Sequence, residues 1–352
     1  MNADWKSFLS NKGAEFEGDV VASFGNLPIE TQVVHSGDVL SDLSQYGLIS
    51  AHGPDAVSFL QGQLTNDLHK VNATNAALNG LCSSKGRLLS NFLVFKRGEI
   101  LYLFLPVNTV ETVLRLLRVY VMRAKLTLEN ATHSLLSFGC SGPHLEKELE
   151  SLGYLVPHLP YAATVTKNVT LIRLSSSKFP RYVAIGELDD LKRLWGALEV
   201  RAAPVGIGAW QLLDIQAGIA VVLPETSDMF VPQMLNWQRV GGVSFKKGCY
   251  TGQEVVARME YLGKLKRRMY RALVRTNDAP RPGEKLYSVH FENNQSCGNI
   301  VNAQASAEGG FEVLAVIDSA TQAKQDVHWG SVAGPRLEDL TLPYSFEADS
   351  VP

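Results

Sequence analysis

The sequence of 352 residues has few cysteines, and they lie far apart. Its four are Cys82, Cys140, Cys249 and Cys297, and none belongs to a C-x-x-C pair. Four scattered cysteines in 352 residues do not make a disulfide framework, and without a C-x-x-C pair they do not make a zinc ribbon, so the sequence predicts neither. The eight histidines share no ligand-like spacing, and we expect no metal site. Any chemistry at sulfur therefore depends on a single thiol.

The sequence also lacks a long hydrophobic run. The apolar run at 101–107 is interrupted at Pro106, whereas a bilayer-spanning helix needs roughly 20 apolar residues. The N-terminal residues lack the basic-then-apolar order of a signal peptide. We therefore expect a cytoplasmic protein that makes no membrane contact, and we expect a monomer.

Neither sign of charge dominates the chain, because 33 Lys and Arg residues stand against 35 Asp and Glu residues, a net charge of -2. This balance excludes a protein that coats nucleic acid with its whole surface. Hydrophobic residues make up 45% and charged residues 19% of the sequence, which is typical of a folded globular chain. The length suits two or three domains.

Strand and helix patterns alternate along the chain without a glycine-rich phosphate loop. Apolar runs predict strands at 88–95 and 100–105, and helical periodicity predicts a helix over 110–121. Asn108 and Glu111 have the spacing of a capping box for that helix. The alternation predicts an α+β layered fold rather than a Rossmann domain.

Further along, a predicted strand at 135–138 and a predicted helix at 190–198 mark a second unit. A helical region with a long loop at 223–251 follows. From residue 265 onward, short alternating strands are separated by Gly and Asn residues. This last pattern is typical of a small antiparallel barrel or sandwich.

The segment 244–258 places a cysteine just before a predicted helix. Thr251 and Glu254 have the spacing of a capping box, and apolar residues follow at helical intervals. The positive end of that helix, together with Lys247, would favour the thiolate form of Cys249. Unpaired cysteines are usually small core residues. The lysine, glycine and threonine neighbours of Cys249, however, are not typical of a hydrophobic core. We interpret Cys249 as a reactive thiol.

Basic residues concentrate in the segment 246–275, which we call the basic segment. It contains nine Lys and Arg residues and two acidic ones, so it carries +7 and the remaining chain carries -9. Such an asymmetry suits a polyanion, for example RNA or the polyglutamate tail of a folate. A solvated strand edge protected by Lys and Arg explains it equally well.

The run Lys-Lys-Gly-Cys-Tyr-Thr-Gly-Gln-Glu at 246–254 resembles the signature of the YgfZ family of tRNA-modifying proteins. This family groups folate-binding relatives of the glycine-cleavage aminomethyltransferase and of a mitochondrial iron–sulfur maturation factor. Further blocks lie in the same order at 59–67, 82–91, 231–233, 241–245 and 342–345. The resemblance covers most of the chain, although the stretch 130–205 adds little to it.

The resemblance implies a three-part fold around a central channel. A ferredoxin-like α+β region would comprise residues 1–133 and 204–263, a second α+β domain residues 134–203, and a C-terminal antiparallel β-barrel residues 264–352. A tetrahydrofolate derivative is expected in the channel, with Cys249 facing it.

The resemblance also implies folate contacts at particular residues. Tyr46 stands where relatives commonly place a Trp, and its ring can still stack on a pterin. Trp210 matches a second contact, although without the resemblance a Trp is more often a core residue. Gln216 stands where relatives usually place a Glu that grips the pterin, so the charge-assisted bond is lost. Arg258 and the basic residues at 264–271 are expected at the folate tail or at a partner.

The implied function is that of an accessory protein which sustains iron–sulfur enzymes such as tRNA methylthiolases, with weak contact to tRNA. The aminomethyltransferases carry a carboxylate where this chain has Ser90 and Asn91, so aminomethyl transfer is not expected. Two alternatives remain open. One is a folate-dependent one-carbon transferase with Cys249 as nucleophile, and the other is an RNA-binding module that uses the basic segment.

Overall fold

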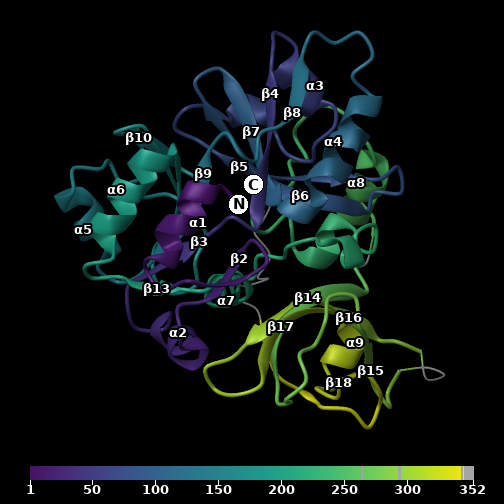
Figure 1. The fold of residues 1–352 in the computed structure, drawn as a ribbon. Coiled ribbons are helices and arrows are strands. Elements are labelled where there is room, and N and C mark those ends of the chain that lie inside the picture. Colours follow the sequence, from purple (N-terminus) through teal and green to yellow (C-terminus); the bar gives the residue numbers. More distant parts are fainter. Residues whose placement is uncertain (264, 292–294, 342–343, 345–352) are drawn as a thin grey trace.

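Three large β-sheets organise the chain in the computed structural model, which describes residues 1–263, 265–291, 295–341 and 344 (Figure 1). The first sheet has five antiparallel strands in the order β5-β6-β7-β4-β8. Its strands are β4 (Tyr46–His52), β5 (Ala77–Cys82), β6 (Leu88–Arg97), β7 (Ile100–Pro106) and β8 (Thr127–Asn130). The strands expected at 88–95 and 100–105 are confirmed as β6 and β7. They form a tight hairpin in which Arg97 pairs with Ile100 and Gly98 takes a φ of 58°.

Two helices, α3 (Ala56–Gln61) and α4 (Val110–Val119), pack on one face of this sheet through an apolar core. The capping box expected at Asn108 is wrong. Residues Val107–Thr109 form a 3₁₀ turn instead, and the residue that precedes α4 is Thr109, whose hydroxyl donates to the carbonyl of Pro106. The turn places Asn108 inside a helical segment, where it cannot act as an N-cap.

The second sheet has six strands in the order β10-β11-β12-β9-β3-β13. They are β3 (Val39–Asp42), β9 (Leu136–Ser141), β10 (Ala163–Thr166), β11 (Val169–Leu174), β12 (Arg181–Gly186) and β13 (Ala203–Val205). Strand β3 comes from the N-terminal part of the chain, and β13 pairs with it in parallel. Helices α1 (Ala3–Ser10), α5 (Leu145–Ser151) and α6 (Leu188–Leu198) cover this sheet (Figure 1). The indole of Trp5 donates to Asp42 at 2.7 Å and fixes α1 to β3.

The C-terminal sheet has six antiparallel strands in the order β18-β15-β16-β17-β14-β19. They are β14 (Arg267–Val274), β15 (Lys285–Tyr287), β16 (Gly298–Ala305), β17 (Phe311–Asp318), β18 (His328–Trp329) and β19 (Leu337–Thr341), with helix α9 (Ser319–Gln322) after β17. The sheet curls into a half-barrel around its own apolar core (Figure 1). The expectation of short antiparallel strands in this part of the chain is confirmed.

Helix α7 (Ile207–Gln216) lies where the three sheets meet (Figure 1). One apolar core runs through this junction and contains Leu93 of the first sheet, Val183 of the second and Val316 of the half-barrel, together with Trp210 of α7. The remaining elements are β1 (Glu15–Glu17), β2 (Val20–Ser23), α2 (Leu27–Val33) and α8 (Gln253–Tyr261). Within the described ranges, none of the helices has both the length and the apolar character that crossing a membrane requires.

Candidate functional site

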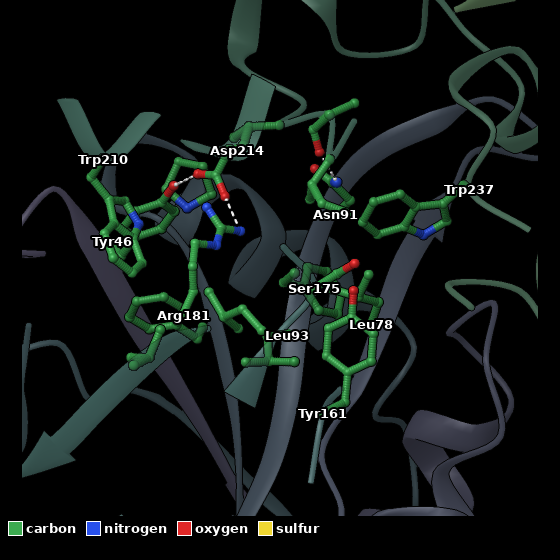
Figure 2. A pocket seen from close by; sticks show the side chains of 18 residues that line it. Tyr46, Leu78, Asn91, Leu93, Tyr161, Ser175, Arg181, Trp210, Asp214 and Trp237 are labelled. Carbon is green, nitrogen blue, oxygen red and sulfur yellow. Dashed lines mark hydrogen bonds and ion pairs between the residues drawn. The ribbon is translucent and has the colours of Figure 1, made fainter. Parts of the chain in front are cut away.

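A cavity of about 600 Å³, part of it open to solvent, lies between the first two sheets and α7 (Figure 2). Most of its wall is apolar. The polar and aromatic side chains that reach it come from distant parts of the chain: Tyr46, Asn91, Phe92, Phe104, Tyr161, Ser175, Arg181, Trp210, Asp214 and Trp237. The fold therefore brings two of the expected folate contacts, Tyr46 and Trp210, to one site.

Tyr46 opens β4 and supplies an aromatic wall of the cavity. Its ring stacks on Phe104 of β7, with centroids 4.8 Å apart and planes inclined by 22°. Its hydroxyl lies 3.5 Å from Oδ2 of Asp214 and donates toward it. Burial and the nearby Asp214 carboxylate raise the pKa of Tyr46 well above its ordinary value, so the phenol stays neutral and remains a donor.

Trp210 lies in α7 and is both a core residue and part of the cavity wall, with only 2% of its surface exposed. Its ring packs on Gly139 of β9, where an added Cβ would come within 2.5 Å of the ring. The guanidinium of Arg181 lies over the same ring, 5.1 Å from its centroid. Trp210 thus supports a cation at the cavity wall.

Arg181 and Asp214 form a buried ion pair that the sequence analysis missed. Nη2 of Arg181, the first residue of β12, lies 2.8 Å from Oδ1 of Asp214 in α7 (Figure 2). Burial raises the pKa of Asp214, while Arg181 and the Tyr46 hydroxyl oppose this shift. A signal was available: each residue is charged and stands within an otherwise apolar strand or helix, where charges are rarely placed without a partner.

Cys249 is the one exposed thiol among the four cysteines. It does not line the cavity, so the structure does not bring this sulfur to the site formed by Tyr46 and Trp210. Burial raises the pKa of Cys82 to about 12 and that of Cys297 to about 11, and it raises the pKa of Cys140 as well. The three buried thiols are therefore poor nucleophiles, and Cys249 remains the candidate for thiol chemistry.

The loop that carries Cys249 rests on the turn between β5 and β6. The N-cap of α8 is Gly252, with a φ of 82°, so the capping box expected at Thr251 is wrong. The Gly252 backbone lies so close to the turn that an added Cβ would lie 2.4 Å from the carbonyl oxygen of Ser83. Only a glycine fits this approach, and the approach fixes where α8 begins.

Lys247 ties the same loop to the end of α3. Its Nζ donates to the carbonyl oxygens of Gln61 and Leu64, each at 2.5 Å, and lies 5.1 Å from the ring centroid of Tyr250. Partial burial lowers the pKa of Lys247 to about 8. The ammonium group is thus engaged by backbone carbonyls, and this side chain positions the loop before Cys249.

Comparison with known proteins shows to which family this chain belongs. The chain is 33% identical over 306 residues to the tRNA-modifying protein YgfZ of Edwardsiella ictaluri (strain 93-146), covering 84% of this chain and 89% of that protein. It is 31% identical over 310 residues to the tRNA-modifying protein YgfZ of Yersinia pestis (strain Pestoides F), covering 88% and 93%. The chain belongs to the YgfZ family.

Two further comparisons agree with this membership. Residues 15–178 match the GCVT N-terminal domain family. The crystal structure of glycine cleavage system aminomethyltransferase T from Bartonella henselae superposes with a TM-score of 0.77 over 96% of both chains, at 14% sequence identity. At that identity the likeness shows a common fold. This chain therefore has the aminomethyltransferase architecture.

Asn91 lies in the cavity wall of this YgfZ family member. It is one of the two positions at which the family resemblance implies a carboxylate in the aminomethyltransferases. Its Oδ1 accepts from the backbone N–H of Val222 and its Nδ2 donates to the carbonyl of Ala220, both at 2.7 Å. The amide thus holds the segment after α7 against β6. Ser90 is fully buried on the same strand. Neither side chain can act as a carboxylate base.

Gln216 lies outside the cavity wall. Its Nε2 donates to Oε1 of Glu312 in β17 at 3.1 Å and so links α7 to the half-barrel. The acidic side chain that does line the cavity is Asp214, two residues earlier in the same helix. The structure therefore offers Asp214 rather than Gln216 to a ligand in the cavity.

The basic segment is divided among several elements. Arg258 is exposed on α8 and pairs with Glu254 at 2.9 Å, away from the cavity. Arg275 pairs with Glu338 at 3.0 Å, and Arg267 donates to the carbonyl of Ser296. Lys264 lies outside the described residues, as do 342, 343 and 345 of the closing signature block. Arg258, Arg267 and Arg275 thus have three different partners within the chain.

Proposed function

We propose that this chain binds a reduced folate in the cavity and supports the assembly or repair of iron–sulfur enzymes such as tRNA methylthiolases, acting as a monomer in the cytoplasm. Its relatives are named tRNA-modifying proteins, and membership of the YgfZ family supports a role in the same process. The observation that carries the proposal is the cavity itself, which combines the Tyr46 ring with the buried ion pair of Arg181 and Asp214.

The residues of the cavity fit a pterin. The flat heterocycle of a folate needs aromatic or apolar walls and a few polar groups that fix its orientation. Tyr46 and the apolar lining supply the walls, and Asp214 and Arg181 supply an acceptor and a donor. A reduced folate, when bound, carries a one-carbon unit on its nitrogens. The chain's own part is to orient the heterocycle and keep water from it.

Cys249 would act from outside the cavity. Because the thiol is exposed, a partner protein can reach it without entering the folate site. One thiolate cannot hold an iron–sulfur cluster that takes four cysteine ligands, so a cluster at Cys249 would be shared with the partner. This arrangement favours an accessory role over a one-carbon transfer in which Cys249 attacks the folate directly.

Neither alternative function gains a specific observation. Direct transfer through Cys249 needs the sulfur at the folate, and the cavity wall does not contain it. An RNA-binding face would use the cations of the basic segment, and three of them, Arg258, Arg267 and Arg275, already have partners within the chain. The accessory role therefore has the most support.

A cellular experiment tests the role of the thiol. The chromosomal gene is replaced by a Cys249→Ser copy, and methylthiolated nucleosides of total tRNA are measured by mass spectrometry. We expect a loss of at least about fivefold relative to the wild type, because serine is neither a comparable nucleophile nor a metal ligand. The matched control is Cys297→Ala, which removes a buried thiol of the half-barrel. Unchanged methylthiolation in the Cys249→Ser strain would contradict the proposal.

A binding experiment tests the folate separately. Calorimetric titration with 5-formyltetrahydrofolate is compared between the wild type and Tyr46→Ala, and we expect the variant to bind about tenfold more weakly because an aromatic wall is lost. Tyr261→Ala serves as the control, since Tyr261 is an exposed aromatic residue of α8. Absence of binding to the wild-type protein would remove the folate from the proposal and leave the cellular result to stand by itself.

A further inference from the structure

Arg181 carries donors that nothing in the described part of the chain accepts. The residue is 2% exposed, and its Nη2 is paired with Asp214. Its Nε and Nη1 atoms are buried and have no hydrogen-bond partner among the described residues. Leaving charged donors unpaired in a protein interior is costly, and native structures nearly always satisfy them. Since Arg181 lines the cavity, an acceptor on a cavity ligand can meet these donors.

The charge balance of the site restricts what that acceptor can be. Arg181 and Asp214 compensate each other, so the ligand end of the cavity carries no net charge. A phosphate or carboxylate buried there would add an uncompensated negative charge to an apolar surrounding. A carbonyl oxygen accepts the same hydrogen bonds without this cost. The part of the ligand that enters the cavity is therefore neutral and presents a carbonyl to Arg181.

Asp214, in turn, favours a ligand that donates hydrogen bonds. One carboxylate oxygen accepts from Arg181 and the other from the Tyr46 hydroxyl at the long distance of 3.5 Å. A carboxylate has about four acceptor positions, so Asp214 keeps capacity for ligand N–H groups. The pair thus presents a donor and an acceptor side by side. A cyclic amide, in which C=O and N–H are adjacent, matches both.

The geometry points to Arg181 as a specificity-determining residue that, with Asp214, selects ligands with a 4-oxo pterin edge and rejects those with a 4-amino edge. This inference rests on the proposed folate function. In a 4-oxo pterin the ring carbonyl faces a donor and the neighbouring N3–H faces an acceptor. A 4-amino pteridine replaces the carbonyl with a donor and loses the N3–H, so it places a donor against the Arg181 cation.

The test compares two ligands that differ at this edge alone, folic acid and aminopterin. Dissociation constants for both are measured by calorimetry with the full-length wild-type protein, Arg181→Met and Arg173→Met. Arg173 is the matched control, because it lies on the adjacent strand β11 and pairs with Glu146 away from the cavity. We expect the wild type and the control to prefer folic acid by about tenfold or more, and Arg181→Met to lose this preference.

The outcomes separate the inference from the proposed function. Binding of neither ligand to the wild type would refute folate binding in the cavity, which is the part of the proposed function on which the inference rests. Binding with the same ligand preference in wild type and Arg181→Met would overturn the inference alone. If Arg181→Met does not fold, Arg181→Lys decides, because it keeps a cation opposite Asp214 but loses the planar guanidinium. A preference reduced by threefold or more supports the inference, and an unchanged one overturns it.

Discussion

Lys247 shows how a single side chain can connect the signature motif to the rest of the fold. Its ammonium group donates to two backbone carbonyls at the end of α3 and lies over the ring of Tyr250. The sequence analysis assigned Lys247 an electrostatic role toward Cys249 because the two residues are neighbours in the chain. The contacts add a structural role, since the lysine holds the loop that carries the thiol.

The lowered pKa of Lys247, about 8 against an ordinary 10.5, makes its contribution to stability depend on pH. Between these two values the unfolded chain binds the proton and the folded chain does not, so the free energy of unfolding rises with pH over this interval. We expect the stability difference between the wild type and Lys247→Met to grow from about pH 7 to about pH 9.5 in favour of the wild type. Urea denaturation at both values measures it. A difference that stays constant or shrinks would show that the amine is charged in the folded protein throughout.

Asn91 gives a second test at the scale of one residue. An Asn91→Asp variant restores a carboxylate to this position but cannot donate to the Ala220 carbonyl, so it places two oxygens against each other. We expect a loss of about 2–3 kcal/mol in the free energy of unfolding and no gain of aminomethyl transfer. Denaturation curves and an assay with methylamine-loaded carrier protein would check this. A stable variant that transfers the aminomethyl group would show that Asn91 alone separates this chain from the transferases.

At the scale of elements, local patterns predicted the strands well and the helix starts poorly. The apolar runs at 88–95 and 100–105 became β6 and β7 because both faces of these strands are buried. Both capping boxes failed, since backbone geometry rather than side-chain spacing sets the starts of α4 and α8. The pairing of β3 with β9 joins residues about a hundred positions apart, and a local sequence pattern cannot predict such a long-range contact.

The start of α8 yields a prediction about the loop that holds Cys249. Gly252→Ala would force a Cβ against the Ser83 carbonyl at a positive φ, so we expect a loss of at least about 2 kcal/mol and a changed rate of Cys249 alkylation. Gly248→Ala is the control, because nothing lies within 4 Å of a Cβ added there. Chemical denaturation and iodoacetamide kinetics measure the two effects. Equal behaviour of the two variants would mean that the turn between β5 and β6 does not position α8.

At the scale of the whole molecule, the cavity is where separate parts of the chain meet. Tyr46 belongs to the first sheet, Arg181 to the second, and Asp214 to the helix between them. Tyr46 and Trp210 could be predicted from the sequence through the family resemblance, and Asn91 through a departure from it. The charge of Arg181 in an otherwise apolar strand signals a buried partner, but which partner it has is fixed only after β12 and α7 have packed.

Because both sheets line the cavity, a ligand bound there would hold the two sheets together. A ligand that binds the folded state alone, at a hundred times its dissociation constant, raises the free energy of unfolding by about 2.7 kcal/mol. With saturating 5-formyltetrahydrofolate we expect slower hydrogen exchange in β4, β12 and α7 together, because the ligand contacts all three. The strands β15 and β18, at the far edge of the half-barrel, serve as the internal control. Protection confined to β4 would mean that the ligand binds the first sheet alone, and that the buried ion pair serves the fold rather than the site.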